Sequence, residues 1–196
     1  MHIMTRKSLL AIVAVAIISF AGMPAIAEDS TVAADPMVMV GGEAMYPAKD
    51  IVDNAVNSAD HTTLVEAVKA AGLVETLKGS GPFTVFAPTN DAFENLPDGT
   101  VAMLLKPENK EGLVKVLTYH VVPGRLTFDA LAEQINAGNG MAQLKTASGG
   151  MLTVMMNGPH NIVVKDEKGN VADISTYDVM QSNGVIQVID TVLLPN

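Results

Sequence analysis

Residues 81–93 have the sequence GPFTVFAPTNDAF. The first half of this stretch alternates and is rich in Phe and Val, which predicts a strand from Pro82 to Ala87. Pro88 has no N–H for a strand ladder and ends the strand, and Thr89 or Asn90 then offers a side-chain oxygen that can cap a short helix. We therefore expect a strand that leads directly into a capped helix.

Helical patterns lie on both sides of this stretch. Apolar residues recur at the i, i+3, i+4, i+7 spacing from Leu64 to Ala71, which predicts an amphipathic helix. Thr62 or Thr63 can cap that helix, and Gly72 suits its end. Further short helices are expected at 51–56, 73–77, 89–96, 107–117 and 127–135.

The second half of the chain changes to strand patterns separated by glycine-containing turns. Helices first and hairpins later predict the α+β class, because alternating β-α-β units are absent from the pattern. The expected strands are 142–146, 151–156, 161–165, 170–174 and 184–194.

The N-terminal segment is typical of an export signal. Arg6 and Lys7 precede an apolar run, and Ala25-Ile26-Ala27 supplies the small residues at a signal peptidase site. The run is shorter than the roughly 20 residues of a spanning helix, so we expect no stable membrane insertion. We expect cleavage near Ala27, with export to the periplasm or the extracellular space. The expected organisation is a signal peptide (1–27), an extended arm (28–48) and a single domain (49–196).

Composition excludes several classes of function. The 196 residues carry twelve Lys and Arg against twenty-one Asp and Glu, so nucleic acid is not an expected partner. The absence of cysteine excludes disulfides, thiolate nucleophiles and thiolate metal ligands. His61, His120 and His160 lack metal-ligand spacing, and no serine lies in a nucleophile-elbow pattern. We therefore expect no enzymatic activity and no bound cofactor.

Methionine is abundant, with twelve residues. In an exported protein a thioether cluster can hold Cu(I), and the candidate ligands are Met37, Met39 and Met45 in the expected arm. The methionines of the expected strand 151–156 point to both of its faces, which favours packing.

Three stretches resemble, in order, the sequence blocks of the fasciclin domain. They are residues 81–93, the sequence LTYHVVPG at 117–124 with its Tyr-His motif, and DVMQSNGVIQVID at 178–190. The resemblance extends from about Ala48 to Pro195 and implies a wedge-shaped β-sandwich flanked by several short helices, in agreement with the α+β class. One position departs from the family, which often has histidine where this chain has Gln187.

The resemblance implies a non-enzymatic module for cell-surface adhesion, with a cell-surface or extracellular matrix protein or glycan as partner. In animal members, the Tyr-His motif and an Asp-Ile pair are tied to integrin binding. The matching positions here are the candidate binding residues Tyr119, His120, Asp178 and Val179. A core or turn role for these residues is at least equally open, and a bacterial-type signal peptide argues against an integrin as the natural partner.

Two alternatives follow from the same residues. Some fasciclin-domain proteins carry carotenoids, and an apolar, methionine-rich sheet could offer adaptable walls to an apolar small molecule such as a carotenoid. The lesser alternative is Cu(I) binding by the arm methionines. The oligomeric state stays open.

Overall fold

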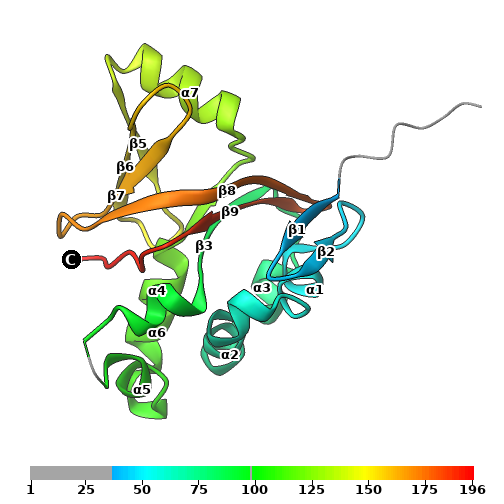
Figure 1. Ribbon diagram of the computed structural model, residues 1–196. Helices are drawn as coiled ribbons and strands as arrows, with labels where there is room; N and C mark the ends of the chain where they lie inside the picture. Colours follow the sequence, from blue (N-terminus) through cyan, green and yellow to red (C-terminus); the bar gives the residue numbers. More distant parts are fainter. Residues whose placement is uncertain (1–36, 98) are drawn as a thin grey trace, which may run out of the picture. The chain divides into compact units, whose positions relative to one another are not determined.

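Figure 1 shows the computed structural model, which describes residues 37–97 and 99–196. The expected signal peptide (1–27) and the first part of the expected arm (28–36) lie outside the described residues. The described residues belong to one unit of the chain, residues 34–196.

Short helices occupy much of the first two thirds of this unit, as the apolar spacing predicts. Gly72 ends the second helix in the left-handed region, with φ of 75°. Thr127 caps the last helix, because its side-chain oxygen accepts a hydrogen bond from the N–H of Ala130. The helices are α1 (Ile51–Ala55), α2 (Thr62–Ala71), α3 (Val74–Leu77), α4 (Asn90–Glu94), α5 (Thr100–Leu104), α6 (Lys110–Tyr119) and α7 (Phe128–Ala137), with 3-10 turns η1 (Ala59–His61) and η2 (Pro107–Asn109).

Seven strands form a mixed sheet in the order β4-β3-β9-β8-β7-β6-β5. Strands β3 and β9 are parallel, and every other neighbouring pair is antiparallel. Together with the helices, this sheet confirms the α+β class. The strands are β3 (Phe83–Pro88), β4 (Val121–Pro123), β5 (Met141–Lys145), β6 (Met151–Met156), β7 (Ile162–Lys165), β8 (Val171–Gln181) and β9 (Gly184–Ile189).

The sheet folds back on itself. The pairing of β8 with β9 shifts register on both sides of Thr176, and such bulges bend a strand. The turn after β5 then reaches the opposite end of the sheet, where Ala147 N–H donates to the Val121 carbonyl at 2.7 Å. The expected sandwich is therefore built from one continuous, nearly closed sheet.

Each face of β3 contributes to a different apolar core, because successive side chains of a strand point to opposite faces. Val85 and Ala87 pack with the helices α1, α2, α4 and α6. Phe86 points the other way, into the space enclosed by the folded sheet, where α7 contributes Leu131 and Ile135. Figure 1 shows α7 over β5 and β6, apart from the other helices.

The structure differs from the expected extended arm at residues 37–48. Here β1 (Val38–Val40) and β2 (Glu43–Met45) form a hairpin whose inner residues Val40 and Met45 are buried in the helical core. The side chain of Asn54 fixes the end of this hairpin by accepting from Tyr46 N–H at 3.1 Å and donating to the Tyr46 carbonyl at 2.8 Å. Strands of three residues are too short to show a clear period in the sequence.

Candidate functional site

An apolar cavity of about 110 Å³ lies between the helical layer and the face of β3 and β9. The hairpin closes one side of it, while α1, α2 and α3 supply further walls. Wall residues include Val40, Met45, Val52, Leu64, Val68 and Ile186. A concave site with almost entirely apolar walls is the usual form of a binding site for an apolar small molecule.

His61 brings a polar group to this cavity from the start of α2. The side chain is only 3% exposed, and its Nδ1 atom lies 2.9 Å from Ser58 Oγ. Burial lowers the pKa of His61, so the ring is neutral near pH 7. Among the described residues, His61 Nε2 is the only buried side-chain nitrogen or oxygen without a hydrogen-bond partner.

No pattern in the sequence indicates the pairing of Ser58 with His61. The two residues are three positions apart and meet only because the 3-10 turn η1 follows Ser58 directly. A serine and a histidine in contact also occur in acyl-transfer sites, where a third group orients the histidine through its other nitrogen. Among the described residues no side chain pairs with His61 Nε2, so none of them completes a triad with Ser58 and His61.

Tyr119, the first residue of the Tyr-His motif, is fully buried in the core inside the sheet. Its hydroxyl donates to the Met151 carbonyl at 2.8 Å and accepts from the Glu167 N–H at 3.1 Å. Burial raises the pKa of Tyr119 to about 12. The side chain thus joins α6 to two turns of the sheet.

His120 is also buried, and both of its ring nitrogens have partners. Nδ1 donates to the Val116 carbonyl at 2.8 Å, and Nε2 accepts from the Leu193 N–H at 3.0 Å. Burial lowers the pKa of His120 to about 4. The residue lines the apolar cavity, but its hydrogen-bonding capacity is already used.

Asp178 and Val179 point to opposite faces of β8. Val179 is buried and lines the cavity, as His120 does. Asp178 has φ of 55°, and its carboxylate accepts from Phe128 N–H at 2.8 Å and from Gln187 Nε2 at 2.8 Å. Gln187 also accepts from Asp178 N–H at 3.0 Å and donates to the Leu126 carbonyl at 3.0 Å, so both ends of its amide group have partners. Partner binding by the four motif residues stays a prediction.

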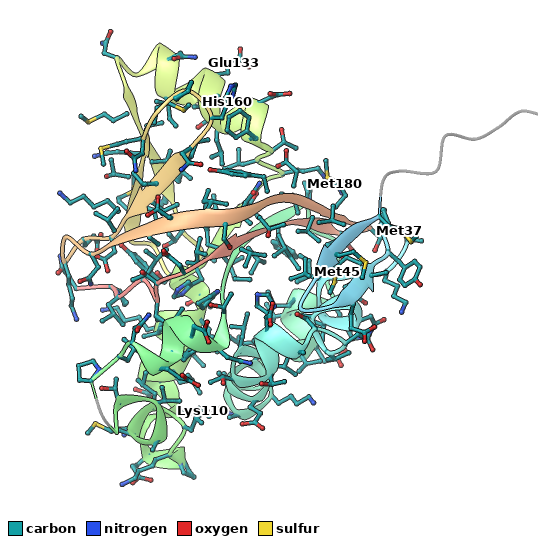
Figure 2. All side chains as sticks on the ribbon, viewed as in Figure 1. Met37, Met45, Lys110, Glu133, His160 and Met180 are labelled. Carbon is teal, nitrogen blue, oxygen red and sulfur yellow. The ribbon has the colours of Figure 1, made fainter. Side chains whose placement is uncertain are left out.

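The register of the hairpin places Met39 and Met45 on opposite faces. Figure 2 labels Met37 and Met45 in this part of the fold. Met37 and Met39 are 58% and 60% exposed, whereas Met45 is 3% exposed and belongs to the core. The structure therefore does not bring all three thioethers together on one surface. Within residues 37–97 and 99–196, no group of three His, Asp or Glu side chains is placed to hold a metal ion, and no helix is long and apolar enough to cross a membrane.

Comparison with known sequences identifies the family. The sequence pattern of the Fasciclin domain matches residues 59–195. The chain belongs to the fasciclin domain family. This match confirms the resemblance that the three sequence blocks indicate.

Fasciclin-domain relatives occur in bacteria and animals. Protein sll1483 of Synechocystis is 47% identical over 176 residues, which cover 89% of either chain. Immunogenic protein MPB70 of Mycobacterium bovis is 36% identical over 72% of this chain and 66% of the relative. Transforming growth factor-beta-induced protein ig-h3 of Sus scrofa is 37% identical over 76% of this chain and 20% of the relative.

A solved structure shows the same fold. It is a pair of FAS1 domains from the insect cell adhesion molecule fasciclin I, similar with a TM-score of 0.65 over 74% of this chain and 51% of that chain. The sequence identity is 18%, so the similarity concerns the fold alone.

The cavity of this fasciclin domain extends beyond the matched family pattern. Residues 59–195 leave out the hairpin and α1, which supply the walls Val40, Met45 and Val52. Ser58, the partner of His61, lies just before the match. The family pattern therefore does not define this side of the cavity.

Proposed function

We propose that this chain is an exported, non-enzymatic fasciclin-domain protein that binds an apolar small molecule. The observation that carries the proposal is the cavity between the helical layer and β3–β9, with its almost entirely apolar walls. Export rests on the charged start, the apolar run and the small residues before Glu28.

The size of the cavity limits what it can enclose. An engineered cavity of about 150 Å³ lined by Leu, Ile and Phe stays dry and binds benzene. A cavity of about 110 Å³ fits one ring or a short hydrocarbon chain. A longer molecule, such as a carotenoid, would place one end here and leave the rest outside the cavity.

A fluorescent apolar probe tests the proposal. N-phenyl-1-naphthylamine can place its phenyl ring in the cavity and leave its naphthalene rings outside. Its fluorescence is expected to increase with the native protein but not with Val68→Phe, because the larger side chain fills the cavity from α2. Val171→Phe is the matched control, since Val171 is exposed on β8, away from the cavity. Circular dichroism verifies that both variants are folded. Equal probe binding by the native protein and both variants would refute the proposal.

The native ligand can be sought directly. The protein purified from its own host is extracted with organic solvent, and the visible spectrum and mass spectrum of the extract are recorded. A carotenoid gives absorption in the visible range, whereas a colourless extract with a bound apolar compound supports another ligand. An extract without any bound compound, combined with no probe binding, would exclude this function.

Cell-surface adhesion to a protein or glycan is the second candidate function. It is favoured by the exposed apolar side chains of the hairpin region, Met37, Met39 and Tyr46. Small exposed apolar clusters of this kind can mark interaction surfaces. The fold similarity to domains of an insect cell adhesion molecule is consistent with this candidate.

Attachment assays test this second function. Deletion of the gene is expected to reduce surface attachment, and Met39→Lys is expected to reproduce part of that loss. Met141→Lys is the matched control, because Met141 is similarly exposed, at 53%, on the edge strand β5. Unchanged attachment after gene deletion would exclude adhesion.

A further inference from the structure

The buried nitrogen of His61 is the starting point. A buried polar atom without a partner destabilises the fold, and native proteins seldom retain one without a reason. Here the unpartnered Nε2 belongs to a residue that lines the apolar cavity. A ligand atom that forms a hydrogen bond with Nε2 would remove that cost and would fix the orientation of the ligand.

Ser58 determines which kinds of atom can pair with Nε2. The Ser58 hydroxyl can donate to Nδ1, which leaves Nε2–H as a donor, or accept from Nδ1–H, which leaves Nε2 as an acceptor. The carbonyl of Ala87 lies near enough to raise the pKa of His61 but makes no hydrogen bond of normal geometry with the ring. His61 can therefore donate from Nε2 to a ligand carbonyl, and it can pair with a ligand hydroxyl in either tautomer.

The absence of charge on His61 also limits the charge that the bound end of the ligand can carry. His61 is neutral and 3% exposed, so a carboxylate beside it would be desolvated without a counter-ion. Lys69 also lines the cavity but is exposed, which places its charge at the solvent side. The inner end of the ligand is therefore neutral.

We propose that the ligand is an apolar molecule with one neutral oxygen group, a carbonyl or a hydroxyl, that forms a hydrogen bond with His61 Nε2. This inference rests on the proposed binding of an apolar small molecule and adds the polar group by which that molecule is recognised.

Two probes with the same carbon skeleton test the inference. They are 4-phenyl-2-butanone, which has one carbonyl, and butylbenzene, which has none. Their dissociation constants are measured by displacement of N-phenyl-1-naphthylamine from the native protein and from His61→Phe. Loss of one neutral hydrogen bond is expected to weaken ketone binding about fivefold in the variant. Binding of butylbenzene is expected to stay unchanged or to become tighter, and the difference between the two probes isolates the hydrogen bond.

An NMR measurement on the native protein tests the inference without a substitution at His61. Long-range proton–nitrogen NMR spectra of the His61 ring are recorded with each probe. The ketone is expected to shift the Nε2 signal, and butylbenzene is expected to leave that signal close to its position in the free protein.

The outcomes separate the inference from the proposed function. If both probes bind the native protein and His61→Phe changes both affinities by the same factor, His61 is only a wall and the inference fails. An Nε2 signal that responds equally to both probes also contradicts the inference, because butylbenzene has no oxygen that could pair with Nε2. If neither probe binds the native protein, the proposed function itself fails.

Discussion

His120 Nε2 accepts a hydrogen bond from the backbone N–H of Leu193 at 3.0 Å, across 73 positions of the sequence. Because Nδ1 donates to the Val116 carbonyl, the ring is neutral and held in a single tautomer. The imidazole thus joins the end of α6 to the C-terminal segment. Protonation of Nε2 would remove the acceptor for Leu193 and would place a charge in the core.

This relationship predicts that stability falls in mild acid. The unfolded chain binds a proton at His120 near pH 6.5, whereas the folded chain binds it only near pH 4, so stability is lost as the pH falls through this window. The expected loss between pH 7 and pH 4.5 is about 2 kcal/mol. His61, whose pKa is also lowered, acts in the same direction. Urea unfolding at pH 7 and at pH 4.5 measures the effect.

His120→Asn is expected to reduce this pH dependence, although it lowers stability at pH 7. The control is His160→Asn, since His160 is exposed at a turn and makes no comparable buried contact. If His120→Asn and the native protein lose the same free energy of unfolding between pH 7 and pH 4.5, His120 does not carry the acid sensitivity.

The hydroxyl of Tyr119 is expected to stabilise the fold. Tyr119→Phe leaves the Met151 carbonyl and the Glu167 N–H without a partner, so the free energy of unfolding is expected to fall by about 1–3 kcal/mol. Tyr46→Phe is the matched control because Tyr46 is 45% exposed. Denaturant unfolding measures both variants. The same small change in the free energy of unfolding for both would show that the buried hydroxyl does not stabilise the fold.

Local signals in the sequence predicted the local structure well. The apolar spacing and Gly72 predicted α2. The Pro88-Thr89 pair at the end of β3 predicted the capped start of α4, where Thr89 Oγ1 accepts from Ala92 N–H at 3.3 Å. Such caps and turns depend on residues a few positions apart, so one sequence contains the necessary information.

Contacts between distant segments could not be predicted in the same way. Thr62 and Thr63 were expected to cap α2, but His61 holds the N-cap position, and Asn90 supplies the oxygen that accepts from Thr63 N–H at 3.0 Å. The cavity depends likewise on a hairpin with three-residue strands and on His61, which carries no spacing signal. Their roles arise from tertiary packing alone.

Gln187 is expected to be essential for the junction of β8, β9 and α7. Gln187→Leu leaves the Asp178 N–H and the Leu126 carbonyl unpaired beside the Asp178 carboxylate, and we expect a loss of about 2–4 kcal/mol. Gln187→His is expected to lose less, since a histidine supplies one donor and one acceptor. Urea unfolding measures the free energy of unfolding of both variants. Equal losses in Gln187→Leu and Gln187→His would show that the hydrogen bonds of Gln187 do not stabilise this junction.

Cu(I) binding is expected to be insensitive to Met45. Met45 is buried on the inner face of the hairpin, whereas Met37 and Met39 are exposed. Titration of Cu(I) into Met39→Leu and Met45→Leu therefore compares an exposed thioether with a buried one. A loss of affinity in Met45→Leu alone would mean that the hairpin opens to bind the metal.

A substitution in the turn of the hairpin is expected to change ligand binding in the cavity. A Cβ atom at Gly41 would lie 2.6 Å from Ser58 Oγ and 2.7 Å from the backbone nitrogen of Asp60, so Gly41→Ala must displace the hairpin or the η1 turn that orients His61. Gly42→Ala is a close control, because Gly42 also has positive φ, at 77°, but has open space around its Cβ position. Both variants are expected to lose about 1–2 kcal/mol from backbone strain.

Only Gly41→Ala is expected to weaken binding of N-phenyl-1-naphthylamine and to reduce the preference for 4-phenyl-2-butanone over butylbenzene. The reason is that Ser58 loses its position beside His61 Nδ1, and the imidazole ring is then no longer held in its orientation in the cavity wall. Probe titration and thermal unfolding of both variants provide the comparison. If Gly42→Ala weakens binding as much as Gly41→Ala, backbone strain alone accounts for the change, and the contact of the hairpin with Ser58 does not position His61.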